Sequence, residues 1–282
     1  MTNRKRWWLG AVVLMAALLT GVAIYQSIRH DAVLQSRLKQ LVPASAVTQV
    51  DCTLVTSGRP YVLLALGQSN AGNHGTPDSM AMPPITVVTG GKCVRASDPL
   101  PDATGTGASI WPRLVARMLR NPLQRPIVVS LLAMESSTID EWTRKRSPLR
   151  ERLVQQLDAL KLLGLLPNAI LWQQGEADAR DATSTVDYAA RLDLLDNLLT
   201  EAGIRAPVYL ARSTVCRTPA NLPIRSAVDT KITQGGRWLS GPDTDTLNGN
   251  RFRHDGCHFS SAGLDAAAQM WAQTLGSAAL AK

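Results

Sequence analysis

The chain has 282 residues, enough for one large α/β domain or two small ones with a sizeable buried core. Its formal net charge of +8 comes mainly from arginine, and the basic runs at 4–6, 144–146 and 150–152 are not interleaved with aromatic residues. No DNA- or RNA-binding motif accompanies them, so the composition argues against a nucleic-acid partner and fits an anionic polysaccharide or an anionic membrane surface.

Residues 7–25 form an apolar run without a charged side chain, preceded by Arg4, Lys5 and Arg6. At about 1.5 Å of rise per residue, a helix of this length just crosses the roughly 30 Å hydrocarbon core of a bilayer. The run therefore predicts a transmembrane anchor, with residues 1–6 in the cytoplasm. A cleaved signal peptide is the alternative. We favour the anchor because the run is longer than a usual signal core and no clear Ala-x-Ala site follows it.

Residues 26–41 are polar with apolar residues at helical spacing, which predicts a helical stalk that Pro43 ends. Residues 43–59 carry Pro, Ser, Thr and Gly and are interpreted as a linker. We therefore assign stalk and linker to 26–58 and one folded domain to 59–282. With an anchor or with a cleaved signal, this domain is exported.

The four cysteines lie far apart in the chain and form no Cys-x-x-Cys pair. They are Cys52, Cys93, Cys216 and Cys257. A zinc site usually has paired spacings, so in an exported domain two disulfides are the better interpretation. The spacing leaves three pairings open.

The folded domain opens with an apolar run of strand length, residues 60–66, that ends abruptly in Gly67-Gln68-Ser69-Asn70. This pattern predicts a buried strand that delivers Ser69 to an exposed turn. A hydroxyl is a weak nucleophile until a base removes its proton. A catalytic Ser69 therefore requires a histidine oriented by an acid elsewhere.

Strand-length apolar runs then alternate with helix-length segments. We expect strands near 85–88, 127–134, 169–173 and 208–211, and helices near 112–120, 149–163, 184–202 and 260–275, with a loop-rich stretch before Asp255. This alternation predicts right-handed crossovers and a mainly parallel sheet with helices on both faces. Sites in such sheets form beyond the carboxyl ends of strands, where we expect Ser69, the loop before Trp111, and Gln174 to meet.

Near the end of the chain, Asp255 and His258 lie three residues apart. His258 would take the Ser69 proton and return it to a leaving alcohol, while Asp255 holds the imidazole and stabilises its cation. His254 lies four residues before His258, a spacing also found in metal sites, but no other ligand cluster accompanies it. We therefore expect neither a metal ion nor a cofactor.

Three blocks in this order resemble those of the SGNH hydrolase superfamily: Gly-Gln-Ser-Asn at 67–70, Gln-Gly-Glu at 174–176 and Asp-x-x-His at 255–258. The first two are similar to the sialate O-acetylesterase and carbohydrate acetylesterase branch, and residues 137–142 resemble its Thr-x-Ile-x-x-Trp segment. The resemblance covers about residues 58–276. It implies an α/β, three-layer, flavodoxin-like SGNH hydrolase fold with Ser69, Asp255 and His258 as the catalytic triad.

By the same resemblance, the oxyanion is expected to be held by the Ser69 N–H, a glycine N–H in the 105–107 loop and the Gln174 side-chain amide. Gly107 is the preferred glycine, and Gly105 stays open. Candidate substrate contacts are Gln68, Asn70, Glu176 and Trp142.

Two of these contacts have a structural alternative. Glu176 is equally a candidate for a carboxylate that fixes the loops of the site, and Trp142 for a half-buried packing residue. Residues 134–137 read Met-Glu-Ser-Ser where the family tends to have small glycines, so the acyl or sugar pocket is expected to differ in shape.

These features predict an SGNH-type serine esterase that deacetylates an O-acetylated glycan through an acyl-serine intermediate. We expect a single-pass protein of a bacterial inner membrane with the catalytic domain facing the periplasm or the outside, or a secreted protein if the signal is cleaved. The same triad could transfer the acyl group to a sugar hydroxyl or act on lipid esters. An anchored glycan-binding module without turnover is the alternative outside catalysis.

The position of Cys257 between the expected acid and base suggests a pairing, because a disulfide there locks the loop that carries both. We predict a Cys216–Cys257 bridge to the end of the strand at 208–211. The second predicted bridge, Cys52–Cys93, ties the linker to the segment after the second strand.

Overall fold

The computed structural model describes residues 15, 20–22, 25–26, 28–44, 47–78, 82–119 and 125–280. The chain forms two compact units, Met1–Lys39 and Gln40–Lys282. In the first unit residues 28–38 are helical, as expected for the stalk. The predicted membrane segment 7–25 falls mostly outside the described residues, and among those described no helix has the length and apolarity needed to cross a bilayer.

The second unit is built around one sheet, whose eight strands in the described part of the chain have the order β1-β4-β3-β5-β2-β6-β7-β8. From β3 to β8 neighbouring strands run parallel, whereas β4 pairs antiparallel with both β1 and β3. The strands are β1 (Thr48–Val50), β2 (Tyr61–Gly67), β3 (Ile85–Thr89), β4 (Lys92–Ala96), β5 (Ile127–Ala133), β6 (Ala169–Gln173), β7 (Val208–Arg212) and β8 (Trp238–Asp243). The sheet is thus mixed, with the expected parallel part and an antiparallel edge.

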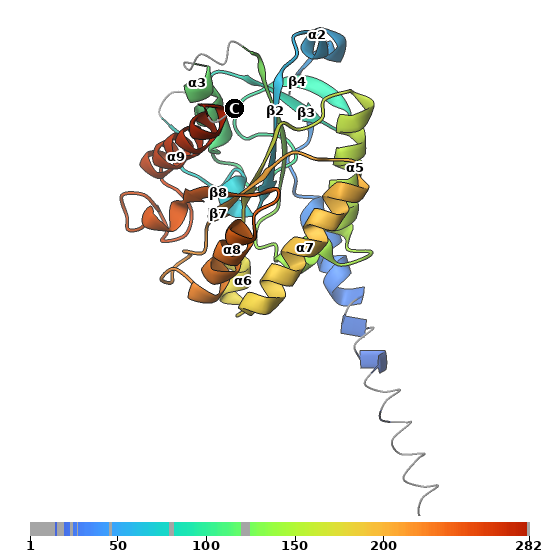
Figure 1. The fold of residues 1–282 in the computed structure, drawn as a ribbon, viewed down its shortest axis with the longest axis vertical. Helices are drawn as coiled ribbons and strands as arrows, with labels where there is room; N and C mark the ends of the chain where they lie inside the picture. The colour runs from blue at the N-terminus through green and yellow to red at the C-terminus, as the bar shows by residue number, and fades with distance from the viewer. Residues whose placement is uncertain are drawn as a thin grey trace, which may run out of the picture. The chain divides into compact units, whose positions relative to one another are not determined.

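Helices cover both faces of this sheet (Figure 1). On one face α3 packs against α9, and on the other α5, α4, α7 and α8 contact one another in that order. The helices are α2 (Cys52–Ser57), α3 (Trp111–Met118), α4 (Ile139–Thr143), α5 (Pro148–Leu162), α6 (Glu176–Arg180), α7 (Thr185–Glu201), α8 (Leu222–Gln234) and α9 (Ser261–Leu280). The three-layer α/β architecture is confirmed.

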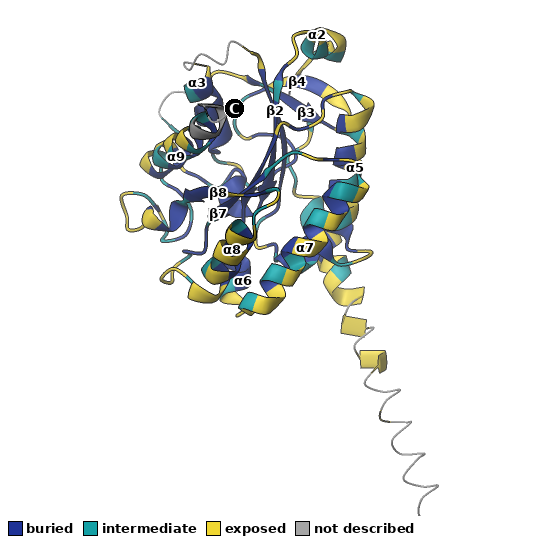
Figure 2. Ribbon diagram, viewed as in Figure 1, coloured by how far each residue is buried: buried dark blue, intermediate teal, exposed yellow. Residues whose placement is uncertain are grey.

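The central strand β2 is apolar along its length and covered on both faces. Its residues Val62 to Leu66 are at most 2% exposed, and it pairs with β5 on one side and β6 on the other. A continuous apolar run of this kind is typical of a buried parallel strand. Figure 2 shows the strands buried and the outward faces of α7 and α8 exposed. The chain passes from β5 to β6 across β2, so the carboxyl end of β2 is a topological switch point. Ligands of open α/β sheets generally bind at such points.

The flavodoxin-like strand order that the resemblance implies is present in the parallel strands β5-β2-β6-β7-β8. They have the order 2-1-3-4-5 when β2 is counted as the first strand and β5 as the second. The β3–β4 hairpin is inserted between β2 and β5 in the chain and extends the sheet beyond β5. In this order β2 has β5 and β6 as neighbours, and the ends of these three strands meet at the switch point.

The interpretation of residues 43–59 as a linker is wrong for most of its length. Residues 48–50 form β1, which pairs with β4, and residues 52–57 form α2. Asp51 caps this helix, because its carboxylate accepts the Thr53 N–H at 2.8 Å. The compact unit therefore begins before residue 59.

The stretch before Asp255, expected to be rich in loops, contains α8 and the edge strand β8. A start signal for α8 is present in the chain: Asn221 accepts the Ile224 N–H at 3.1 Å, and Pro223 stands in the first turn. β8 carries Pro242, which lacks a backbone donor and is tolerated because β8 has a neighbour on one side only.

Both predicted disulfides are confirmed. Cys52 is bonded to Cys93, which links α2 to β4, and Cys216 is bonded to Cys257. The second bridge joins the loop after β7 to the loop before α9. It therefore ties two loops that approach the carboxyl edge of the sheet.

Two tryptophans fasten the α3–α9 layer to the strand ends next to Ser69. Trp111 donates its indole N–H to the carbonyl of Ala71 at 2.7 Å, and Trp271 donates to the side-chain oxygen of Gln173 at 3.1 Å. The two indole rings lie 6.4 Å apart and are fully buried. The turn that carries Ser69 thus rests on a packed core.

Candidate active site

Ser69 begins a tight turn directly after β2. Gly67 has φ +157°, and a Cβ on it would lie 2.0 Å from the carbonyl oxygen of Gln173, so only glycine fits where the chain leaves the sheet. The Gln68 carbonyl then accepts the N–H of Ala71 at 2.8 Å, which closes the 3₁₀ turn Ser69–Ala71. The turn holds Ser69 at the carboxyl edge of the sheet, 4% exposed.

Asp255 and His258 are bonded to each other as expected. The Nδ1 of His258 lies 2.9 Å from Asp255 Oδ2, while Asp255 Oδ1 accepts the N–H groups of His258 and Cys257 at 2.7 and 2.9 Å. Burial alone would raise the pKa of Asp255. The backbone bonds and the histidine ring outweigh it and hold this pKa well below its usual range. Asp255 is therefore ionised at neutral pH.

Arg217 is a second partner of the acid. Its guanidinium lies 3.1 Å from Asp255 Oδ2, and the backbone N–H of Arg217 donates to the carbonyl of Gly256 at 2.7 Å. Nothing in the sequence pattern singled out Arg217. It follows Cys216, so the disulfide brings it to the loop before α9 that carries Asp255 and His258, called here the acid–base loop.

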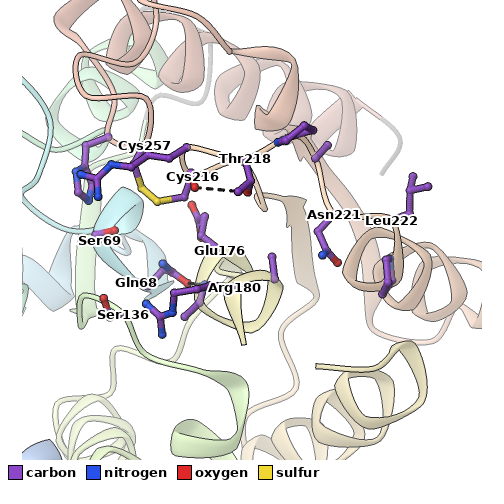
Figure 3. Close-up of a pocket in the computed structure, with 17 residues that line it drawn as sticks. Gln68, Ser69, Ser136, Glu176, Arg180, Cys216, Thr218, Asn221, Leu222 and Cys257 are labelled. Carbon is purple, nitrogen blue, oxygen red and sulfur yellow. Dashed lines mark hydrogen bonds between the residues drawn. A yellow bond between two sulfur atoms is a disulfide. The ribbon is translucent and has the colours of Figure 1, made fainter. Parts of the chain in front are cut away.

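Ser69 and His258 line the same pocket, of about 770 Å³ (Figure 3). The lining residues are Gln68, Ser69, Ser136, Glu176, Ala177, Ala179, Arg180, Cys216, Arg217, Thr218, Pro219, Ala220, Asn221, Leu222, Pro223, Cys257 and His258. The disulfide forms the wall beside Ser69, and Asn221 and Leu222 stand at the far side. The structure thus brings the predicted nucleophile and base to one cavity at the switch point.

Asn70, a predicted substrate contact, connects the parts of the site instead. Its side-chain amide donates to Glu176 Oε1 at 2.7 Å and to the carbonyl of Cys257 at 3.2 Å. Asn70 is not among the lining residues of the pocket. It therefore joins the turn Ser69–Ala71, called here the nucleophile turn, to α6 and to the acid–base loop.

Glu176 lines the pocket and is almost completely buried. Its Oε1 accepts hydrogen bonds from Asn70 and from Ser213 Oγ, the latter at 2.8 Å. Burial raises the pKa of Glu176 to about 7, against the opposing effects of these two bonds and of the Arg253 charge. The loop-fixing role considered for this carboxylate agrees with these contacts.

The side-chain amide of Gln68 has a defined orientation. Its Oε1 accepts the N–H of Ala177 at 3.0 Å and lies 3.5 Å from the N–H of Gly175. A backbone N–H cannot donate to an amide NH₂, so the oxygen must face α6 and the NH₂ group must face away from it. Gln68 also lines the pocket beside Ser69 (Figure 3).

The two oxyanion donors predicted besides Ser69 are engaged elsewhere. The Gly107 N–H donates to the carbonyl of Asn73 at 2.7 Å. The amide of Gln174 donates to Asp178 Oδ2 at 2.6 Å and to the carbonyl of Ser137 at 2.9 Å. In this arrangement neither group is available to a substrate oxygen. Gln174 is instead a buried link between β6 and the segment before α4.

The alternative glycine, Gly105, stands at a position where no residue with a side chain would fit. Its φ is +95°, and a Cβ would lie 2.3 Å from the carbonyl oxygen of Asn73. The loop that contains it packs closely on the segment after Ser69.

Trp142 does not face the pocket. It is fully buried, donates its indole N–H to Ser137 Oγ at 3.0 Å and meets Trp172 edge to face at 5.4 Å. The interpretation of Trp142 as a substrate contact is therefore wrong. Its side chain packs between α4 and the sheet.

Among the described residues, one group has the spacing of a metal site: His254, Asp255 and His258, whose ligand atoms lie within 4.8 Å of one another. Two of the three are the expected base and its acid. A cation bound there would engage the groups that are expected to move the Ser69 proton.

Residues 60–276 match the family model described as carbohydrate esterase, sialic acid-specific acetylesterase. No curated protein sequence matches the chain.

Solved structures share the fold. A protein from Arabidopsis thaliana is 18% identical with a TM-score of 0.60, over 77% of this chain and 98% of that chain. The structure titled NanS is 16% identical with a TM-score of 0.54, over 79% and 98% of the two chains. A carbohydrate acetylesterase from Xanthomonas citri is 14% identical with a TM-score of 0.53, over 78% of this chain and 56% of that chain. With the family match over most of its length, the chain belongs to the carbohydrate esterase family of sialic acid-specific acetylesterases.

Proposed function

We propose that this protein is a serine esterase that removes O-acetyl groups from a glycan through an acyl-serine intermediate on Ser69. The observation that carries the proposal is the bonded pair Asp255–His258 on the same pocket as Ser69, in a chain of the carbohydrate esterase family. Family membership supports an acetylated sugar as substrate, and the pocket volume of about 770 Å³ gives room for one.

In the first half of the reaction, Ser69 Oγ attacks the acetyl carbonyl while His258 takes its proton. Asp255 holds the ring through Nδ1 and stabilises the imidazolium. When the tetrahedral intermediate collapses, the C–O bond to the sugar breaks and His258 protonates the leaving hydroxyl. In the second half, His258 deprotonates a water that attacks the acyl-serine, and acetate leaves.

An oxyanion forms in each half of this reaction, and it needs hydrogen-bond donors. We assign them to the Ser69 N–H and the NH₂ group of Gln68. The orientation of the Gln68 amide and its place on the pocket beside Ser69 support this assignment, and so does the engagement of Gly107 and Gln174 elsewhere. Donors held by the backbone of α6 need no reorganisation when charge develops, which is what makes such donors effective.

The two disulfides support an oxidising compartment, such as the periplasm or the cell exterior. We propose that residues 7–25 carry the chain into or across a bacterial inner membrane, either as an anchor or as a cleaved signal. Mass spectrometry of the mature N-terminus, together with fractionation of membranes and soluble extract, distinguishes the two.

The test of function compares the wild type with Ser69→Ala on p-nitrophenyl acetate and on O-acetylated sialic acids and polysaccharides. Loss of a triad residue should lower turnover by about 10⁴-fold or more. Ser136→Ala, a change at another serine of the same pocket, is the matched control and should keep activity. A folded Ser69→Ala variant with a tenth of wild-type activity would refute the proposal.

The same assay separates hydrolysis from transfer. With an added unacetylated glycan, an esterase releases all its acetyl groups as free acetate, whereas a transferase passes them to the acceptor. If no acetyl ester of any kind is cleaved but the glycan binds, the chain is a binding module.

A further inference from the structure

Three of the four histidines of the chain gather at the candidate active site, although only His258 has a place in the mechanism. The ring of His74 stacks on the ring of His258, with 5.1 Å between centroids and 25° between planes. The ring of His254 lies 6.1 Å from the His258 ring at 29°. His74 comes five residues after Ser69 in the chain, so the nucleophile and this stacking partner share one loop.

His74 is itself held in place from several sides. Its Nε2 lies 3.1 Å from Thr104 Oγ1 and 3.6 Å from Glu135 Oε2, and its side chain is 15% exposed. The neighbouring Asn73 donates its N–H to the carbonyl of Thr104 at 2.9 Å. The carbonyl of His74 lies 3.3 Å from Nε2 of His254. The His74 ring is therefore held in a fixed position against one face of the His258 ring.

A fixed surface matters because the bond to Asp255 does not by itself fix the ring of His258. A hydrogen bond at Nδ1 anchors one edge of the imidazole, but the ring can still rock about that edge. Rocking moves Nε2, the atom that must reach Ser69 Oγ. A flat ring packed against the imidazole face opposes this motion.

The charge of His74 fits this role. Burial lowers its pKa, and the neighbouring His258 lowers it further, while Glu135 and Asp255 act in the opposite direction. A neutral His74 can pack against His258 without repelling the imidazolium that forms when His258 takes the serine proton. The exposed His254 lies farther away and makes the weaker contact.

We propose that His74 is a positioning residue of the esterase, whose ring stacks on the catalytic base and holds its Nε2 in line with Ser69. The inference rests on the proposed function of the Ser69–His258–Asp255 site. It requires only the flat face of the His74 side chain. The polar contact of Nε2 with Thr104 serves to hold that face in place.

Two substitutions separate the ring from its polar atom. His74→Phe keeps a flat ring and loses the contact with Thr104, whereas His74→Gln keeps a polar group and loses the ring. Misplacement of a catalytic group by about 1 Å can cost about 100-fold in rate. We therefore expect His74→Gln and His74→Ala to lower kcat by about 10- to 100-fold with KM within about threefold, and His74→Phe to recover most of the rate.

The experiment measures kcat and KM on p-nitrophenyl acetate for these variants of the full chain, with His30→Ala as the histidine control and circular dichroism as the test of folding. His30 lies in the other compact unit and should leave the rate unchanged. His254→Ala should cost less than His74→Ala. Wild-type kcat in a folded His74→Ala variant, or equal losses in His74→Phe and His74→Ala, would overturn the role of the ring. An inactive wild type would instead remove the proposed function itself.

Discussion

At the scale of single residues, the site depends on which polar groups are free to meet a substrate. Gln68 and Gln174 both carry an amide, and both lie at the carboxyl ends of strands in the centre of the sheet. Both hydrogens of Gln174 are used, by Asp178 and Ser137, and its oxygen accepts from Tyr188 at 2.7 Å. Gln68 is bonded to α6 through its oxygen. Side-chain orientation, rather than residue type, distinguishes the roles proposed for the two glutamines.

This difference predicts opposite results for the two glutamines. Gln68→Glu keeps an oxygen for the Ala177 N–H but replaces the proposed donor with a second oxygen. It should lower kcat by at least the 10²- to 10³-fold typical of one lost oxyanion donor, with little change in KM. Steady-state kinetics on p-nitrophenyl acetate measures both constants. A change in KM alone would make Gln68 a substrate contact.

Gln174→Ala is the matched control for this test. It leaves Asp178 and Tyr188 with lost partners in a buried site, so it should lower the free energy of unfolding by about 1–3 kcal/mol. The folded enzyme should keep kcat within a few-fold of wild type. If Gln174→Ala instead lost 10²-fold in kcat without loss of stability, the original assignment of Gln174 to the oxyanion would stand.

At the scale of elements, the acid–base loop before α9 is held by two kinds of link. The Cys216–Cys257 bridge ties it to the loop after β7, and Asn70 ties its backbone to the nucleophile turn. Arg253 adds a buried guanidinium that donates to the carbonyls of Cys257 and Thr244. These contacts converge on Cys257, the residue before the base.

The two disulfides allow a controlled comparison, because both span 41 positions of the chain. In the chain-entropy model each should contribute about 4 kcal/mol. We expect Cys52→Ser/Cys93→Ser and Cys216→Ser/Cys257→Ser to lower the midpoint of urea unfolding by similar amounts. Only the second pair should also lower kcat in the folded protein, because only that bridge holds the acid and base.

Activity under conditions where each variant is fully folded by far-UV circular dichroism decides this prediction. Equal kcat in the two double variants would show that Asn70 and Arg253 alone suffice to position the loop.

At the scale of the whole molecule, buried Glu176 couples stability to pH. Its pKa of about 7 in the folded chain lies above its ordinary value of 4.5, so the folded state binds the proton more tightly than the unfolded state does. The stabilisation from this group is complete below about pH 4.5 and is lost as the pH rises to about 7. The loss is on the order of 3 kcal/mol.

Glu176→Gln should remove this dependence, since an amide does not titrate in this range. The free energy of unfolding in urea, measured from pH 5 to 8, should fall less steeply for Glu176→Gln than for wild type. Glu201→Gln, at the exposed carboxyl end of α7, is the control and should follow the wild type. Parallel curves for wild type and Glu176→Gln would mean that Glu176 is ionised in the folded protein throughout this range.

Much of the fold could be predicted from the sequence because local patterns decide it. Apolar runs of strand length predicted β2, β3, β5, β6 and β7, and the helix-length segments that alternate with them predicted α3, α5, α7 and α9. The Asp-x-x-His block at 255–258 predicted the acid–base pair, and the place of Cys257 inside that block suggested how the four cysteines pair. The strands, the helices and the acid–base pair depend on residue type and on neighbours within a few positions.

Tertiary structure decided what depends on distant partners. The engagement of Gln174, the burial of Trp142 and the place of the β3–β4 hairpin in the sheet follow from contacts between elements, which no local pattern reports. The Gln68 amide takes its orientation from an N–H 109 positions away, and His74 meets His258 across 184 positions of the chain. Whether a donor is free, or a ring is stacked, is settled by the group that packing brings beside it. The sequence alone determined which groups could do the chemistry, and packing determined which of them face the pocket.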